Sequence, residues 1–331
     1  MMQTPYEHKI FSRFDPTGKE QLGDLAMRLL EEQKNTWPMC GTGYASLDAV
    51  QIKEIQCNGY DIKVQFNPKR IVSSAAKVDP KSIAERKCFL CVPHLPGEQK
   101  GVLVEQDGER FLVLCNPMPI FRAHYTISHV DHRPQEIEPF LETMMLFARW
   151  LAPRFSVFYN GPKCGASAPD HMHFQAAPKS GIPIEIETQK PDRRHVIRDS
   201  GSGKTLLLKN LGRTIVVAES ADPLETASIV RDILFRLQEV QHGHAEPLIN
   251  LIATRDDDGM TRAILFPRSK HRPDVFFKEG DEKLLISPAA VDIGGLVVTP
   301  LEHDFHRVNA HLMESIFFEV SLDQTLVESV L

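Results

Sequence analysis

The sequence lacks the features of a membrane protein and of a nucleic-acid-binding protein. No apolar run reaches about 18 residues, the length that marks a membrane-spanning helix, and the N-terminal residues 1–8 (MMQTPYEH) do not resemble a signal peptide. Positive charge is not in excess, because 38 Lys and Arg residues stand against 44 Asp and Glu residues, a net charge of -6. This balance argues against a protein that binds nucleic acid through a basic surface. We therefore expect neither a membrane nor a nucleic acid as partner.

Cysteine is also scarce, with six residues in a chain of 331. So few cysteines in a chain of this length do not form a disulfide framework, and they favour a reducing, cytoplasmic setting. The remaining composition is ordinary, with 42% hydrophobic and 25% charged residues. Such a chain can form one large domain or two domains of average size.

Hydrophobic periodicity predicts both helices and strands. In the first half, helical spacing covers residues 17–36 and 136–152, and strand-like patterns cover 59–66, 110–115, 124–128 and 155–160. In the second half, a hairpin is predicted at 205–210 and 213–218, a helix at 224–240, and strands at 248–253 and 262–267. The charged segment 192–198 is interpreted as a junction between the halves.

The most informative segment is residues 160–175 (NGPKCGASAPDHMHFQ), a loop of small residues followed by three polar side chains at alternate positions. Because side chains of a strand alternate between its faces, His171, His173 and Gln175 are expected to point the same way. A loop with accessible backbone amides beside an imidazole suits a phosphate held close to a nucleophile. The alternative is an edge strand with polar residues on its solvated face.

This segment resembles the active-site motif of the histidine triad superfamily, in its nucleotidyltransferase branch with His-x-His-x-Gln. That branch includes galactose-1-phosphate uridylyltransferase, the diadenosine tetraphosphate phosphorylases and the GDP-hexose phosphorylases. The hydrolase branch has a third histidine where this chain has Gln175. The resemblance therefore implies an enzyme that transfers a nucleotidyl group.

The resemblance implies an α+β fold with two related half-domains, each an antiparallel sheet flanked by helices. We expect residues 1–195 to form the half that carries the motif and residues 196–331 to form a degenerate half. Residues 116–132 also align without a gap on residues 287–303, with two identities, which we interpret as a trace of the duplication. The family further implies a homodimer.

The resemblance assigns the catalytic roles to two residues. His173 would attack the α-phosphorus of a nucleotide to form a nucleotidyl-histidine, and Gln175 would donate its amide to a phosphate oxygen. A segment in the tail, residues 286–298, favours a GDP-hexose as the nucleotide-sugar substrate, with inorganic phosphate or a sugar phosphate as acceptor. A dinucleoside polyphosphate such as diadenosine tetraphosphate is the alternative substrate, and a nucleotide-binding sensor without turnover is the alternative class of protein.

Further residues are expected to bind the nucleotide and its phosphates. They are Asn67, Arg70, Lys77, Asn116, Asn160, Gly161, Gly165 and Ser167. In the uridylyltransferase pattern a serine stands three residues before the first histidine, where this chain has Ala168. The alternatives are a solvated basic loop at residues 67–77 and an ordinary Asn-Pro turn at Asn116. In the second half, cations that could bind the acceptor phosphate are Arg262, Arg268, Lys270 and Arg272.

Cys88 and Cys91 have the spacing of two zinc ligands, but zinc requires two more. The resemblance assigns His132 and His171 to these places, so the implied cofactor is a structural zinc ion beside the nucleophile. The alternative is two buried thiols without a metal.

Two motifs are interpreted as structural. Residues 201–205 (GSGKT) resemble the end of a phosphate-binding loop, but Arg198 replaces its first glycine, so a hairpin turn is predicted. His242 and His244 stand where a helix is expected to end.

Overall fold

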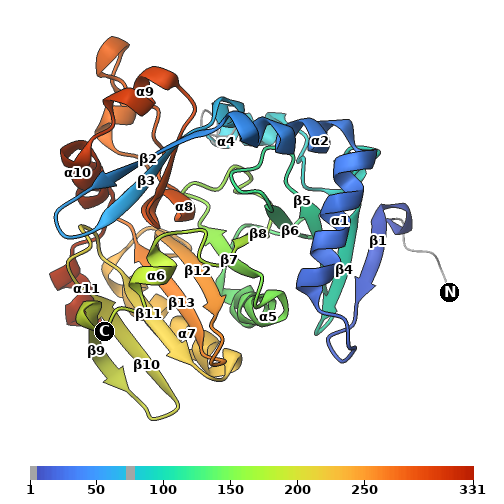
Figure 1. Ribbon diagram of the computed structural model, residues 1–331. Coiled ribbons are helices and arrows are strands. Elements are labelled where there is room, and N and C mark those ends of the chain that lie inside the picture. Colours follow the sequence, from blue (N-terminus) through green and yellow to red (C-terminus); the bar gives the residue numbers. More distant parts are fainter. Residues whose placement is uncertain (1–5, 72–78) are drawn as a thin grey trace.

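The computed structural model describes residues 6–71 and 79–331 (Figure 1). The expected phosphate-binding residue Lys77 lies outside these ranges. Among the described helices, none combines the length and the apolar character needed to cross a membrane.

The main element is an eleven-stranded sheet with the order β1-β4-β5-β6-β8-β7-β12-β13-β11-β10-β9. Its strands are β1 (Ile10–Phe14), β4 (Gly101–Gln106), β5 (Glu109–Cys115), β6 (Tyr125–His129), β7 (Phe155–Asn160), β8 (His173–Pro178), β9 (Arg194–Asp199), β10 (Gly203–Leu208), β11 (Val216–Ser220), β12 (Ile249–Arg255) and β13 (Thr261–Pro267). Only the pairing of β1 with β4 is parallel within this sheet. The antiparallel sheet and its helices confirm the expected α+β fold class.

The sheet contains the same arrangement twice. In the first half, β5 and β6 are followed by helix α5 (Leu141–Leu151) and then by β7 and β8. In the second half, β10 and β11 are followed by helix α7 (Pro223–Val240) and then by β12 and β13. The strand orders β5-β6-β8-β7 and β12-β13-β11-β10 mirror each other, and β7 pairs with β12 where they meet.

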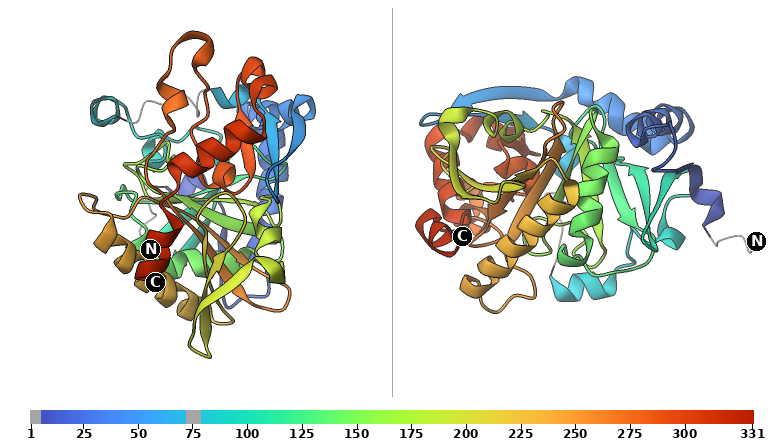
Figure 2. Two further views of the ribbon diagram at one scale, coloured as in Figure 1. Left: turned by 90° about the vertical axis from the view of Figure 1, so that its left-hand side faces the viewer. Right: turned by 90° about the horizontal axis from the view of Figure 1, so that it is seen from below.

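Helices cover one face of the sheet, and smaller elements cover part of the other (Figure 2). Helix α1 (Leu22–Thr36) packs on β1, β4 and β5, while α5 and α7 pack on the strands nearer the centre. The opposite face of the second half carries a three-stranded sheet of β2 (Gln51–Gln56), β3 (Asp61–Phe66) and β14 (Leu296–Thr299). The remaining helices are α2 (Pro38–Ala45), α4 (Pro80–Glu85), α6 (Ile184–Glu187), α8 (Ala290–Ile293), α9 (Glu302–Arg307), α10 (Ala310–Val320) and α11 (Gln324–Val330).

Two sequence interpretations are corrected by this topology. The alignment of residues 116–132 on 287–303 does not mark the duplication, because it equates β6 with β14, which pairs with β3 in the small sheet. The counterpart of β6 in the strand order is β11. The charged segment 192–198 is not a junction, because most of it forms β9, the edge strand beside β10. The proposed boundary at residues 195 and 196 falls inside this strand.

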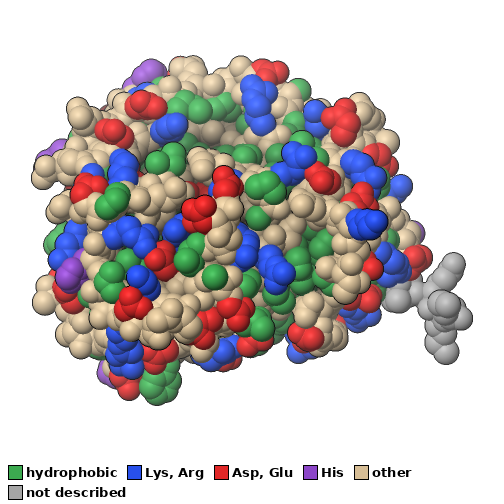
Figure 3. All heavy atoms as spheres, turned by 60° about the horizontal axis from the view of Figure 1, so that its bottom comes forward, with side chains coloured by type: hydrophobic (Ala, Val, Ile, Leu, Met, Phe, Trp, Pro, Cys, Tyr) green, Lys and Arg blue, Asp and Glu red, His purple; other side chains and the backbone are tan. Residues whose placement is uncertain are grey.

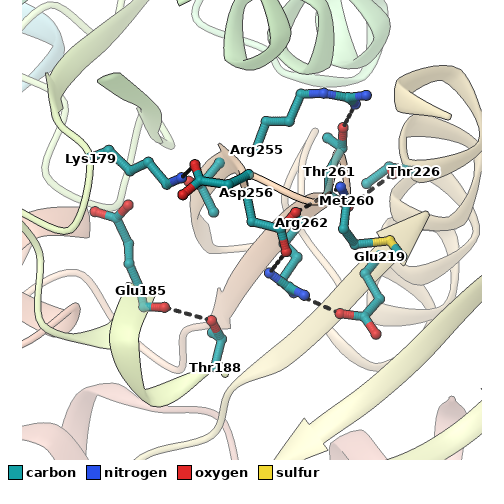
Figure 4. A network of polar contacts seen from close by, with 12 residues as sticks. Lys179, Glu185, Thr188, Glu219, Thr226, Arg255, Asp256, Met260, Thr261 and Arg262 are labelled. Carbon is teal, nitrogen blue, oxygen red and sulfur yellow. Dashed lines mark hydrogen bonds and ion pairs between the residues drawn. The ribbon is translucent and has the colours of Figure 1, made fainter. Parts of the chain in front are cut away.

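Charged residues of the second half are largely paired with one another. Figure 4 shows Arg262 between Glu219 and Asp256, at 2.8 Å and 2.6 Å. Over the face drawn in Figure 3, basic and acidic side chains are interspersed. The pairing explains why Arg262, one of the cations considered for phosphate binding, has a structural role.

The two motifs interpreted as structural have the predicted local structure. Gly201 has φ +82° in the tight connection between β9 and β10, which confirms the hairpin turn. His242 and His244 follow the end of α7.

Candidate active site

Strand β8 presents the motif to a cavity on the face of the sheet opposite α1, α5 and α7. Phe174 is buried in the core beneath those helices, and by alternation His173 and Gln175 face the other side. There they line a cavity of about 410 Å³ together with residues from both halves of the chain. The alternation expected from the sequence is therefore what places the two side chains in one site.

The hydrogen bonds of His173 define which nitrogen faces the cavity. Its Nδ1 lies 2.8 Å from the carbonyl oxygen of His171 and donates to it. Burial lowers the pKa of His173 below its ordinary value, so the imidazole is neutral near pH 7. A neutral ring with its proton on Nδ1 has a lone pair on Nε2. Nε2 is thus the ring atom of His173 with a lone pair free to react with an electrophile in the cavity.

Gln175 is oriented by a histidine that the sequence analysis did not identify. The backbone amide of Ile120 donates to Nδ1 of His124 at 3.2 Å, so the ring proton is on Nε2. Nε2 donates to Oε1 of Gln175 at 2.9 Å. Burial lowers the pKa of His124 to about 3, which keeps it neutral. With its oxygen held by His124, Gln175 has its NH₂ group available to an anion in the cavity.

The loop after β7 forms another part of the wall through Gly165, Ala166 and Ser167. Gly165 has φ +96°, and a Cβ atom there would lie 2.7 Å from Cβ of Ala289, so glycine is required for the loop to approach the second half. Ala168 is buried in a small cluster with Cys88 and Leu90. Ser167 therefore lies at the cavity, although it stands one position before the serine of the uridylyltransferase pattern.

Asn160 connects this loop to the second half. Its Oδ1 accepts from the side chain of Asn250 at 2.9 Å and from the backbone amide of Ala290 at 2.7 Å. Asn250 also donates to the carbonyl of Cys164 and accepts from the buried Arg268. Asn160 lines the cavity, while Arg268 serves to join backbone segments of the second half.

The remaining wall has two distinct characters. The first half contributes mainly apolar and aromatic side chains, which include Trp37, Phe89, Leu90, Leu95, Pro96 and Leu114. A separate, basic part of the wall contains two arginines, Arg70 from the first half of the chain and Arg272 from the second. Arg70 donates to the carbonyl of Met118 at 2.8 Å, and Arg272 donates to the hydroxyl of Ser287 at 2.9 Å. Burial lowers the pKa of Arg70 to about 10, so it is still cationic near pH 7.

The cavity brings together most but not all of the residues expected from the sequence. The expected residues that line it are Arg70, Asn116, Asn160, Gly165, Ser167, His173 and Gln175. Asn67 does not line it, since its side chain is buried and donates to the carbonyl of Pro119. Gly161 does not line it either, and its amide donates to Ile249. Asn116 also accepts from the amide of Met118, so it forms the turn considered as its alternative.

A cluster of four possible metal ligands lies beside His173 and includes His171. Ligand atoms of Cys88, Cys91, His132 and His171 all lie within 4.8 Å of one another. Nε2 of His171 donates to the carbonyl of His129 at 2.8 Å, so its Nδ1 carries the lone pair. That Nδ1 lies 3.3 Å from Sγ of Cys88 and 3.3 Å from Nδ1 of His132. These four residues could hold a metal ion, and their sulfur and nitrogen donors suit zinc.

The fold and the cavity define an α+β protein in which a buried histidine, His173, and a glutamine, Gln175, lie at one site. Residues 29–178 match a family described as a domain of unknown function (DUF4922). No curated protein matches the chain in sequence.

Solved structures similar to this chain include the yeast Ap4A phosphorylase Apa2. Its crystal structure superposes with a TM-score of 0.62 at 14% identity, over 92% of this chain and 98% of that chain. The structure of the same yeast enzyme in complex with Ap4A gives a TM-score of 0.58 at 15% identity, over 92% and 98%. The complex with AMP gives 0.56 at 16% identity, over 89% and 96%. The likeness confirms the expected fold over nearly the whole chain.

Proposed function

We propose that this protein is a nucleotidyltransferase of the phosphorylase type that acts through a nucleotidyl-His173 intermediate. The observation that carries the proposal is the geometry of His173, whose Nδ1 is occupied by a backbone carbonyl while the ring lines the cavity. Nε2 would attack the α-phosphorus, a P–N bond would form, and the bond from that phosphorus to its bridging oxygen would break. Inorganic phosphate would then attack the same phosphorus and release His173.

Gln175 and the adjacent loop would stabilise the charge that develops on the phosphorus. The NH₂ group of Gln175 is directed by His124, and Gly165, Ala166 and Ser167 lie across the cavity wall. Donors that are held in place before the reaction stabilise a transition state without the cost of reorganisation. The aromatic and apolar part of the wall suits a nucleobase, while Arg70 and Arg272 suit the phosphates.

The substrate that we propose is a dinucleoside polyphosphate, and Ap4A is its best representative. Two of the similar solved structures are of an Ap4A phosphorylase with Ap4A or with AMP. This supports the alternative substrate of the sequence analysis better than the GDP-hexose that was its first choice. With Ap4A and phosphate the reaction would give ATP in the first step and ADP in the second.

We further propose a structural zinc ion in the cluster of Cys88, Cys91, His132 and His171. A zinc ion with four protein ligands has no open position for substrate, so it would anchor the start of β8 and not take part in the reaction. Two related halves are proposed from the repeated strand order, with the second half beginning at β9, which pairs with β10. A cytoplasmic setting agrees with six cysteines that are all free.

The test is phosphorolysis of Ap4A, GDP-glucose, GDP-mannose and UDP-glucose, each with inorganic phosphate, followed by chromatography of the products. We expect ATP and ADP from Ap4A, with no product from the His173→Gly variant. A larger kcat/KM for a GDP-hexose would overturn the substrate assignment but not the nucleotidyl transfer. Nucleotide binding without turnover of any of the four would instead support the sensor.

A further inference from the structure

The pairing of β7 with β8 ends two residues short of His173, the proposed nucleophile and the first residue of β8. The two strands pair in regular register as far as Phe158 opposite Gln175. Two residues further on, the same register would place Asn160 opposite His173. These two residues are instead bridged by the side chain of Gln135, which is 1% exposed. A side chain from outside the sheet thus takes part in the sheet ladder at the site.

The amide of Gln135 acts here as an inserted peptide group. Its Oε1 accepts from the backbone amide of His173 at 2.8 Å. Its Nε2 donates to the carbonyl of Asn160 at 3.0 Å and to the carbonyl of His173 at 3.0 Å. One acceptor and two donors are used at the same time. Among the neutral side chains of this length, only a glutamine offers both an oxygen acceptor and an NH₂ group with two donors.

Gln135 is itself held from the second half of the chain. The hydroxyl of Tyr159 lies 3.2 Å from the carbonyl of Gln135 and 2.8 Å from Oε1 of Glu246. The other oxygen of Glu246 accepts from the backbone amide of Ile137 at 2.6 Å. Glu246 therefore fixes the segment 135–137 from two sides, and this segment fixes the backbone of His173.

We propose that Gln135 is a positioning residue for nucleotidyl transfer, which sets the separation between His173 and the phosphate-binding loop. This inference rests on the proposed function. Because the side-chain amide of Gln135 is inserted between β7 and β8, the backbone of His173 is held at a fixed distance from Asn160, the last residue of β7, where the loop begins. Small errors in the position of a reacting group have large effects on rate, of the order of 100-fold for about 1 Å.

The test compares Gln135→Glu with the control Gln241→Glu. The carboxylate of Gln135→Glu keeps the acceptor for His173 but faces two carbonyl oxygens without a proton to donate. Gln241 is also buried, its Oε1 accepts from Leu248, and its Nε2 has no partner among the described residues, so its replacement retains its hydrogen bond. Both variants introduce a buried carboxylate, and only one of them alters the spacing of the strands.

Two quantities are measured with Ap4A as substrate, namely the single-turnover rate of nucleotidyl-enzyme formation and the affinity for AMP. We expect the rate to fall by about 100-fold in Gln135→Glu with the affinity for AMP unchanged, and both to be retained in Gln241→Glu. Should Gln135→Glu melt below the assay temperature, Gln135→Asn is measured in its place, since it keeps the amide but does not reach both strands. An unchanged rate, or a loss of rate matched by an equal loss of affinity, would overturn the positioning role. Absence of the intermediate in the unaltered protein would overturn the proposed function, and this inference with it.

Discussion

The action proposed for Gln175 depends on a histidine that lies 51 positions earlier in the chain. His124 holds the oxygen of the Gln175 amide through Nε2, and the backbone amide of Ile120 determines that this nitrogen carries the proton. Without such a partner, a glutamine amide can turn and present its oxygen to a phosphate, which repels it. His124 therefore contributes through the orientation of Gln175 and not through contact with substrate.

We expect His124→Phe to lower kcat by about 10- to 100-fold, less than the roughly 100- to 1000-fold found when a donor to a developing anion is removed, because Gln175 itself stays in place. Phenylalanine keeps an aromatic ring beside Phe158 but offers no donor to Gln175. The measurement is a double-mutant cycle with Gln175→Ala, using kcat for phosphorolysis of Ap4A. In the Gln175→Ala background the second substitution should have little further effect. Effects that multiply fully would show that the two residues act independently.

Residues of the motif were predictable because they are close together in the sequence. His171, His173 and Gln175 have the alternation of a strand, and the loop before them is rich in small residues. His124, Gln135 and Glu246 gave no such signal, because each reaches the site only through the tertiary fold. Trp37 likewise enters the cavity from a distant segment, whereas Arg272, which also lines it, was among the cations considered for the acceptor phosphate.

At the scale of elements, the four candidate metal ligands come from three separate segments of the chain. The segment with Cys88 and Cys91 belongs to neither sheet, His132 follows β6, and His171 precedes β8. Their four ligand atoms were expected together from the family pattern. The spacing of the two cysteines alone indicated only half of the site.

We expect Cys88→Ser to lose the bound zinc and to lower Tm, because binding of a structural metal contributes directly to the stability of the fold. Metal content is measured by mass spectrometry and Tm by calorimetry. Cys57→Ser is the control, since Cys57 is buried and free but lies in another cluster. A chelator should lower Tm of the unaltered protein and leave that of Cys88→Ser unchanged. Equal zinc content in Cys88→Ser and in the unaltered protein would rule out this metal site.

The three helices that pack on the main sheet, α1, α5 and α7, and several of the longer strands were predicted from periodicity, for example α7 at 224–240 and β13 at 262–267. The shorter helices and α10 were not predicted. The missed strands have patterns that did not stand out. Strand β2, with the sequence QIKEIQ, is largely exposed. Strand β4 is buried on both faces over most of its length, so its sequence does not alternate between apolar and polar residues. Strand β9 was mistaken for a junction because an edge strand can be highly charged.

At the scale of the whole molecule, the two halves form one continuous sheet, and the site draws on both. Strand β7 pairs with β12, and Glu246 of the second half holds the segment that supports His173. The repeated order of strands supports the proposed duplication, although the ungapped sequence alignment pointed to the wrong strand. Two identities in 17 positions carried too little information to locate it.

The burial of Glu246 predicts that the free energy of unfolding depends on pH. Burial raises the pKa of Glu246 from its ordinary value of 4.5 to about 7 in the folded protein. The folded state then binds a proton that the unfolded state has released, so this residue lowers the free energy of unfolding as the pH rises from about 4.5 to about 7. In Glu246→Gln this loss is absent. Denaturant unfolding at pH 5 and pH 8 should show the variant gaining stability relative to the unaltered protein at the higher pH. The same difference at both pH values would contradict this assignment.

The central claim is a covalent bond between His173 and a nucleotide, and the most direct measurement is the intact mass of the protein after brief mixing with Ap4A. We predict a gain equal to one adenosine monophosphate, labile to acid, lost on addition of inorganic phosphate, and absent in His173→Gly at equal Tm. An adduct that persists in His173→Gly would place the nucleophile elsewhere. Phosphorolysis without any adduct would contradict the two-step mechanism.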